Sequence, residues 1–213
     1  MTIKAILLDI RGVLMLSDVP SAEIQQKWEH RLGLQPGELL GALQGKMVAE
    51  RELGSEMSDL VKVGNFTEED LWHIAAQKYQ LSEIELKQLQ SDLDSGERVN
   101  QELLDYLRLL KPHYKLGVVS NTWTDTRATL IRQHPMNELM DVMLFSSVEK
   151  VAKPEAAIYL RAVNYLDVQP IEAVFIDDTP ANVIGAQAAG LLGLQFTNTV
   201  QLIQSLAQLG VSV

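Results

Sequence analysis

The first part of the chain changes from a strand pattern to a helical one. The short apolar run Ile6-Leu7-Leu8 predicts a buried β-strand that ends at Asp9. From about Ser17 to about Gly96 the signals are helical: Ile24, Trp28 and Leu32 recur four residues apart, after the candidate cap Ser21 and before Gly33. Capping-box-like segments begin at Thr67 and Ser82. This stretch is therefore predicted to be a helical insertion.

From Asn100 onward, helical and strand patterns alternate. The predicted elements are a helix around Leu103, Leu104 and Leu107, a strand at 115–119, a helix from Thr124, a strand at 142–145, a helix from Pro154, a strand at 173–176, a helix to Ala189, a short strand at 194–196 and a last helix at 200–209. Such alternation implies right-handed parallel crossovers. The predicted fold class is α/β, with a doubly wound parallel sheet covered by helices on both faces.

Composition and charge narrow the functional classes. With 213 residues, 46% of them hydrophobic, the chain can bury a full core in one domain with a large insertion or in two small domains. It has no cysteine, which excludes disulfides and thiolate chemistry and suits a reducing compartment; without an apparent leader or spanning segment, we expect a cytoplasmic protein. The net charge of −10 argues against nucleic acid or an anionic membrane as partner.

Polar residues stand where the predicted strands end or helices begin. Asp9 follows the first strand, Ser120-Asn121 follows the strand at 115–119, and Asp177-Asp178 follows the strand at 173–176, while Lys153 precedes a helix. Open α/β sheets place their chemistry at the carboxyl ends of the strands. Each group alone would be an ordinary cap or turn residue. Together, two carboxylate sites, a hydroxyl and a lysine fit metal-assisted nucleophilic catalysis on an anion.

The order and spacing of these residues resemble the four motifs of the haloacid dehalogenase superfamily. The motifs are Asp9-x-x-Gly12-Val13-Leu14, Ser120-Asn121, Lys153-Pro154 and Asp177-Asp178-x-x-x-Asn182. The resemblance covers the whole chain and implies a Rossmann-like core, formed by residues 1–16 and 97–213, with an inserted helical cap at 17–96. The fourth motif is similar to that of the phosphatase-like branch, which includes sugar-phosphate phosphatases and the amino-terminal domains of epoxide hydrolases.

The resemblance also implies a role for each matching residue. Asp9 would be the nucleophile that forms an acyl phosphate. Mg²⁺ would be held by Asp9, Asp178 and the backbone carbonyl of Arg11. Asp177 is expected to pair with Lys153, although the sequence leaves open which of the two adjacent aspartates meets the metal.

The remaining motif residues would act on the phosphoryl group. Ser120 and the backbone amides around Asn121 would hydrogen-bond its oxygens, and Lys153 would neutralise their charge. Asn182 would order its loop. The expected substrate is a small phosphorylated metabolite, whereas the sequence leaves the oligomeric state open.

Arg11 departs from the family pattern. Phosphatases of this family usually have a second aspartate, the general acid and base, at the position of Arg11. A guanidinium stays protonated at neutral pH and cannot do this work. Three functions remain open: a Mg²⁺-dependent phosphatase in which Arg11 points away or grips phosphate, a metal-independent 2-haloacid dehalogenase, and a catalytically weak or silent binding or regulatory module in which Arg11 bridges the acidic groups.

Overall fold

A five-stranded parallel sheet forms the centre of the computed structural model, which describes residues 2–17, 22–37, 39, 72–73, 76–94, 97–122 and 135–213. The strand order is β5-β4-β1-β6-β7. The strands are β1 (Ala5–Leu8), β4 (Lys115–Ser120), β5 (Val142–Phe145), β6 (Ala173–Asp177) and β7 (Leu192–Gln195). Strand β1 pairs with both β4 and β6, so the first strand of the chain lies at the centre of the sheet.

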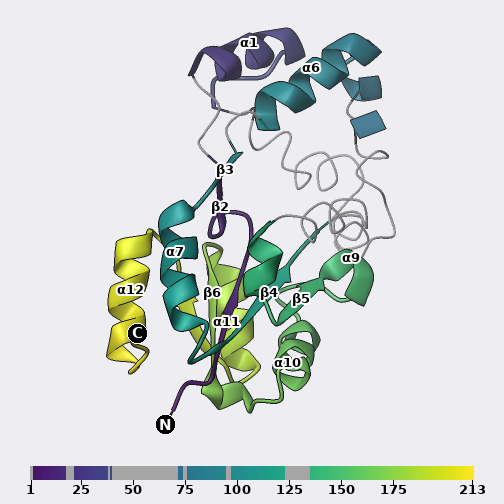
Figure 1. Ribbon diagram of the computed structural model, residues 1–213. Coiled ribbons are helices and arrows are strands. Elements are labelled where there is room, and N and C mark those ends of the chain that lie inside the picture. Colours follow the sequence, from purple (N-terminus) through teal and green to yellow (C-terminus); the bar gives the residue numbers. More distant parts are fainter. Residues whose placement is uncertain are drawn as a thin grey trace.

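Helices cover both faces of this sheet (Figure 1). On one face lie α7 (Gln101–Leu110) and α12 (Thr199–Gln208), which pack against Ile6 and Leu8. On the other face lie α10 (Ala156–Tyr165) and α11 (Pro180–Ala188), which pack against Ala5 and Leu7. Side chains along a strand point alternately to the two faces, so a fully apolar β1 is buried from both sides. The predicted doubly wound α/β fold is confirmed.

Three short elements connect the layers. The 3₁₀ helix η1 (Pro135–Leu139) precedes β5, helix α9 (Ser146–Glu149) follows it, and the 3₁₀ helix η2 (Pro170–Glu172) leads into β6. Helix α9 begins directly at the carboxyl end of β5, which brings its first residues to the same edge of the sheet as the ends of the other parallel strands.

Two of the helices in the described part of the insertion lie side by side beyond the core (Figure 1). Helix α1 (Ala22–Leu32) and helix α6 (Glu83–Asp94) are joined by Asp92, which accepts hydrogen bonds from Lys27 Nζ at 2.7 Å and Trp28 Nε1 at 2.8 Å. Trp28 is buried in a small apolar cluster of its own. The insertion thus has a core separate from the two that flank the sheet.

An antiparallel ribbon links the insertion to the sheet domain. Its strands are β2 (Met15–Ser17) and β3 (Glu97–Val99). The sequence did not predict this ribbon, because three residues are too few to show an alternating pattern. The ribbon straddles the predicted domain boundaries near residues 16 and 97, and those boundaries stay a prediction.

The other predicted elements agree with the structure within a few residues, apart from those outside the described part. The capping box at Ser82 is present: the backbone N–H of Ser82 donates to Glu85 Oε2 at 2.9 Å, and the N–H of Glu85 donates to Ser82 Oγ at 3.3 Å. Ser21, Thr67 and the helix predicted from Thr124 lie outside the described residues.

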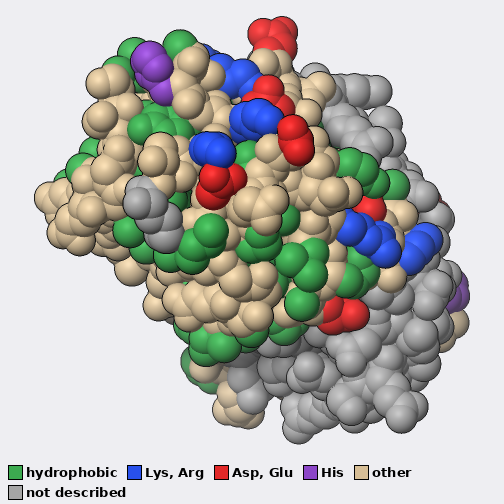
Figure 2. All heavy atoms as spheres, turned by 90° about the horizontal axis from the view of Figure 1, so that it is seen from below, with side chains coloured by type: hydrophobic (Ala, Val, Ile, Leu, Met, Phe, Trp, Pro, Cys, Tyr) green, Lys and Arg blue, Asp and Glu red, His purple; other side chains and the backbone are tan. Residues whose placement is uncertain are grey.

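Charged side chains are mixed rather than segregated on the face seen in Figure 2. Basic and acidic groups lie there in small neighbouring groups among apolar and neutral side chains. Nucleic-acid-binding surfaces instead gather Lys and Arg into a continuous patch or stripe. Among the described residues, no helix is long and apolar enough to cross a membrane.

Candidate functional site

Three neighbouring strands deliver the candidate residues to one edge of the sheet. Strand β1 lies between β4 and β6 in parallel register, so Asp9, Ser120 and Asp177 all lie at the carboxyl ends of adjacent strands. Lys153 comes from the turn before α10, and its buried side chain reaches the same edge. The sequence predicted this convergence from the polar residues at the strand ends, and the sheet order produces it.

Lys153 bridges two carboxylates from different strands. Its Nζ lies 2.8 Å from Asp9 Oδ1 and 2.7 Å from Asp177 Oδ2, and it also lies 5.4 Å from the ring centre of Phe175. Burial by itself lowers the pKa of Lys153, but the charges of Asp9 and Asp177 outweigh burial and raise that pKa above its ordinary value. Lys153 is therefore a fixed positive charge inside an acidic site, and the predicted pairing of Asp177 with Lys153 is present.

The carboxylate of Asp177 is fully occupied by protein groups. Besides Lys153, it accepts hydrogen bonds from Asn182 Nδ2 at 3.1 and 3.0 Å and from the backbone N–H of Thr179 at 2.8 Å. Asp177 has no exposed surface, whereas Asp178 is exposed. Asn182 thus orders the acidic loop through Asp177. The geometry leaves Asp178 the more accessible of the adjacent pair.

The carboxylates of Asp9, Asp177 and Asp178 form a compact acidic cluster, in which Asp177 is already occupied by protein groups. Each offers a carboxylate oxygen, and these oxygens lie within 4.8 Å of one another. Burial raises the pKa of Asp9 to about 6, although the charge of Lys153 opposes this rise and the charge of Asp177 adds to it. Burial and the charge of Asp177 also raise the pKa of Asp178. Both shifts show that this site disfavours its own negative charges, and hard cations with oxygen ligands relieve such a cost.

Gly12 leaves room for the carboxylate of Asp178. The glycine has a φ of +83°, and a Cβ built on it would overlap the carboxylate of Asp178. A residue with a side chain would thus be strained and would also displace Asp178. The motif glycine is explained by this close approach.

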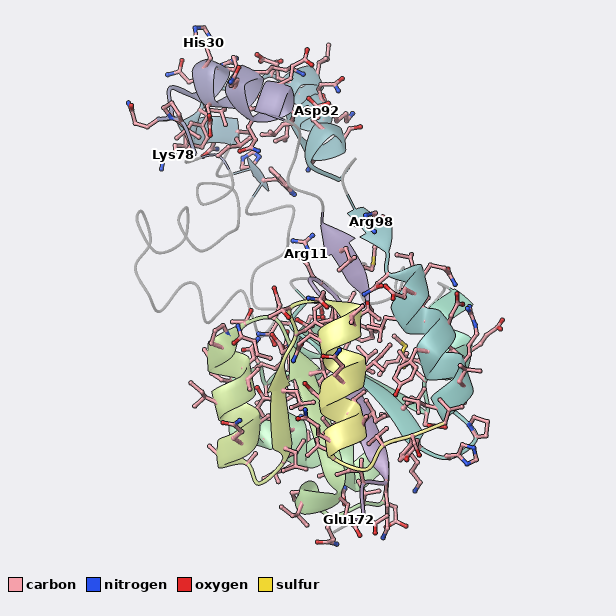
Figure 3. The ribbon with its side chains drawn as sticks, turned by 90° about the vertical axis from the view of Figure 1, so that its left-hand side faces the viewer. Arg11, His30, Lys78, Asp92, Arg98 and Glu172 are labelled. Carbon is pink, nitrogen blue, oxygen red and sulfur yellow. The ribbon has the colours of Figure 1, made fainter. Side chains whose placement is uncertain are left out.

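Arg11 lies beside the site in the turn that follows β1. Arg11 is exposed. Figure 3 shows its side chain at the edge of the core that faces the insertion, directed away from the sheet. The backbone turn is closed by the N–H of Gly12, which donates to the carbonyl of Met15 at 2.7 Å. Lys153, rather than a residue of this turn, supplies the contacts described above to both Asp9 and Asp177.

The loop after β4 is tied to two other parts of the site edge. Asn121 bonds through its side chain to the backbone of Lys153, and Thr122 bonds to Ser146 at the start of α9. The sequence predicted that amides around Asn121 bind substrate, but it did not predict these cross-links. Ser146 and Ser147 gave no signal, since two serines after a strand are ordinary cap residues.

The family model of haloacid dehalogenase-like hydrolases matches residues 3–190 of the chain. With the parallel sheet and the acidic strand ends described above, this match shows that the chain belongs to the haloacid dehalogenase-like hydrolase family. The family expected from the four motifs is confirmed.

Known proteins resemble the chain over different lengths. Flavin mononucleotide hydrolase 1 of Arabidopsis thaliana is 43% identical over 61 residues, which are 29% of this chain and 25% of that protein. Bifunctional epoxide hydrolase 2 of Mus musculus is 24% identical over 221 residues, covering 97% of this chain and 38% of that protein. The chain spans between 25% and 45% of the lengths of the curated relatives that it matches.

A solved structure is similar in fold to this chain. It is a haloacid dehalogenase family enzyme of Bacteroides thetaiotaomicron in complex with magnesium and inorganic phosphate, with a TM-score of 0.68 and 20% identity over 92% of this chain and 94% of that chain. At this identity the likeness shows the fold.

Proposed function

We propose that this protein is a Mg²⁺-dependent phosphatase of small phosphorylated metabolites. The observation that carries the proposal is the buried Lys153, which holds Asp9 at 2.8 Å beside two further carboxylates at the carboxyl edge of the sheet. A carboxylate nucleophile, a fixed cation and a cluster of oxygen ligands are the groups that phosphoryl transfer requires. The relatives include a flavin mononucleotide hydrolase, which supports the substrate class.

Asp9, Asp178 and the backbone carbonyl of Arg11 are the proposed ligands of Mg²⁺. Asp177 is not proposed as a ligand, because Lys153, Asn182 and the N–H of Thr179 already occupy its oxygens. When bound, the ion supplies positive charge to a phosphoryl oxygen and to the nucleophilic carboxylate. A structural relative in complex with magnesium and inorganic phosphate supports this assignment.

In the proposed reaction, a carboxylate oxygen of Asp9 attacks phosphorus. A bond forms between that oxygen and phosphorus while the bond from phosphorus to the leaving oxygen breaks, which gives an acyl phosphate on Asp9 and an alcohol. Water then attacks the acyl phosphate and releases inorganic phosphate, which restores Asp9. Lys153, Ser120 and the amides near Asn121 hydrogen-bond the phosphoryl oxygens.

Arg11 is proposed to contact the anionic substrate rather than to move a proton. Its guanidinium stays protonated and has a planar fork of donors that suits phosphate. The leaving oxygen then takes its proton from solvent or from another residue. Because a positioned acid or base is worth about 10²–10⁴-fold in rate, turnover by this protein should be slow for unactivated esters.

The insertion is proposed to act as a cap, with boundaries at residues 17 and 96. The ribbon of β2 and β3 supports this, because it is the described connection between the helices of the insertion and the sheet domain. Closure over the site would exclude water while the acyl phosphate forms, and opening would release products.

The test is hydrolysis of an aryl phosphate by the wild type and Asp9→Asn, each with Mg²⁺ and with a chelator. We expect turnover only by the wild type with Mg²⁺. Asp105→Asn is the matched control, since Asp105 is an exposed aspartate that pairs with Arg108 on α7. Halide release from a 2-haloacid without metal would instead indicate a dehalogenase. No turnover in any mixture would indicate a silent binding or regulatory module.

A further inference from the structure

Asn121 makes a reciprocal contact with the backbone of Lys153. The N–H of Lys153 donates to Asn121 Oδ1 at 2.9 Å, and Asn121 Nδ2 donates to the carbonyl of Lys153 at 3.0 Å. The two residues are 32 positions apart and come from different loops. One side chain therefore satisfies both backbone groups of the lysine that bridges Asp9 and Asp177.

The loop that carries Asn121 is itself anchored next to the site. The N–H of Thr122 donates to Ser146 Oγ at 3.0 Å, and Ser146 Oγ donates to the carbonyl of Thr122 at 3.2 Å. The hydroxyl oxygens of Thr122 and Ser147 lie 3.0 Å apart, and all three side chains are buried. Asn121 thus extends from a loop that is fixed to the start of α9.

The segment at Lys153 is also held from its other side. A Cβ built on Gly185 of α11 would overlap the carbonyl oxygen of Pro154, so the helix backbone lies directly against this segment. The Lys153-Pro154 segment is therefore held by α11 at Pro154 and by the Asn121 side chain at Lys153. The amine of Lys153 must meet two carboxylates at 2.7 and 2.8 Å, and hydrogen bonds of this length tolerate little displacement of the backbone.

We propose that Asn121 is a positioning residue for Lys153, and that it keeps Lys153 and Ser120 at a fixed separation in the phosphoryl site. The proposal rests on the proposed function, because it assigns a task to the same site. Asn121 acts through the backbone of Lys153, and its side chain is not a direct ligand of phosphate. Loss of the side chain should therefore matter only while Lys153 is present.

A double-mutant cycle tests this. Inorganic phosphate is titrated by calorimetry in the presence of Mg²⁺ into the wild type, Asn121→Ala, Lys153→Met and the double variant. A cycle isolates the coupling of two residues in contact. We expect Asn121→Ala to weaken phosphate binding about tenfold in the wild-type background, as for other interacting pairs, and less than about twofold in the Lys153→Met background.

Asn198→Ala is the matched control. The Oδ1 of Asn198 also accepts a backbone N–H, that of Gln201 at 2.9 Å, but at the start of α12 rather than in the site. Its phosphate affinity should equal that of the wild type. An equal loss in Asn198→Ala would mean that general destabilisation causes the effect and would overturn the proposal.

An equal effect of Asn121→Ala with and without Lys153 would show that Asn121 contacts phosphate directly, which also overturns the proposal. Lys153→Met leaves buried carboxylates without their cation and can fail to fold, so the crystal structure of Asn121→Ala gives a second readout. We expect Nζ of Lys153 to leave Asp9 or Asp177, and an unmoved Lys153 contradicts the proposal. If the wild type binds phosphate but does not hydrolyse an aryl phosphate, the proposed function is contradicted. The coupling between Asn121 and Lys153 in phosphate binding would still stand.

Discussion

Gly12 and Asp178 lie so close together that a Cβ on the glycine would overlap the carboxylate of the aspartate. The two residues are 166 positions apart and belong to the turn after β1 and the loop after β6. Their contact joins the proposed nucleophile loop to the proposed metal ligand. This relationship can be tested by filling the space.

Gly12→Ala should abolish Mg²⁺ binding and Mg²⁺-dependent hydrolysis, because the new methyl group displaces Asp178. The positive φ adds strain of about 1–2 kcal/mol to the folded state. Calorimetric titration of Mg²⁺ and thermal unfolding measure the two effects. Gly210→Ala is the control: Gly210 has a φ of +80°, and a Cβ built on it would meet nothing within 4 Å. Equal loss of stability with retained metal binding in both variants would contradict the displacement of Asp178.

Asp9→Asn should leave the metal-free protein as stable as the wild type, or more stable, at pH 7 to 8. The folded pKa of Asp9 is raised to about 6, so the folded state binds more protons than the unfolded state between about pH 4 and 6. The contribution of the protonated Asp9 carboxyl to the free energy of unfolding is therefore fully present below about pH 4 and is lost as the pH rises through about 6. The amide cannot ionise and avoids this loss of about 1–3 kcal/mol.

The measurement is urea unfolding of both proteins in chelator at pH 4, 6 and 8. The difference in the free energy of unfolding should grow in favour of Asp9→Asn between pH 4 and pH 8. A variant that is less stable than the wild type at pH 8 would show that the pair with Lys153 outweighs the cost of burying the Asp9 charge.

Lys153→Met should lower the free energy of unfolding by about 3–5 kcal/mol, because it leaves two buried carboxylates without their cation. Adding Asp177→Asn should restore part of that loss, since it removes one uncompensated charge. Lys4→Met is the control: Lys4 pairs with Glu172 at 2.6 Å on the surface, and such pairs are worth at most about 1 kcal/mol. Chemical denaturation at pH 7 gives all four values, and equal effects at Lys153 and Lys4 would refute the argument from burial.

Arg11→Asp should raise Mg²⁺-dependent hydrolysis of an aryl phosphate by at least about tenfold, since a positioned acid or base contributes about 10²–10⁴-fold. Arg98→Asp is the control, because Arg98 is an exposed arginine on β3 whose replacement changes the net charge equally. The measurement is the initial rate of hydrolysis at saturating Mg²⁺ for the wild type and both variants. An unchanged or lower rate in Arg11→Asp would show that Arg11 does not limit the chemistry.

Much of the architecture was predictable because it depends on local patterns. The runs at 142–145 and 173–176 are buried strands, and their apolar character is visible without knowing their neighbours. The helices α7, α10, α11 and α12 were predicted from local helical patterns in the same way, whereas α9 was not. The ribbon of β2 and β3 was not, since it exists only through pairing between residues about 80 positions apart.

Within the site, the sequence determined which side chains were available and that they would meet. Asp9, Ser120 and Asp177 follow strands whose parallel order places their carboxyl ends together, and the four ordered motifs indicated the family. Local pattern places all three residues at one edge, because a residue that ends a strand lies at the carboxyl edge of any parallel sheet. The strand order β4-β1-β6 then makes them neighbours.

Only the tertiary structure decided most of the hydrogen-bond partners, the exposure and the direction of those side chains. The pair of Asp177 with Lys153 was expected from the family resemblance, and the structure adds Asn182 and the N–H of Thr179 as further partners of Asp177. It also leaves Asp178 accessible, directs Arg11 away from the sheet, and joins Asn121 to the backbone of Lys153. Adjacent aspartates look equivalent in a sequence. They differ in the fold because burial and hydrogen-bond partners depend on contacts between loops that are far apart along the chain.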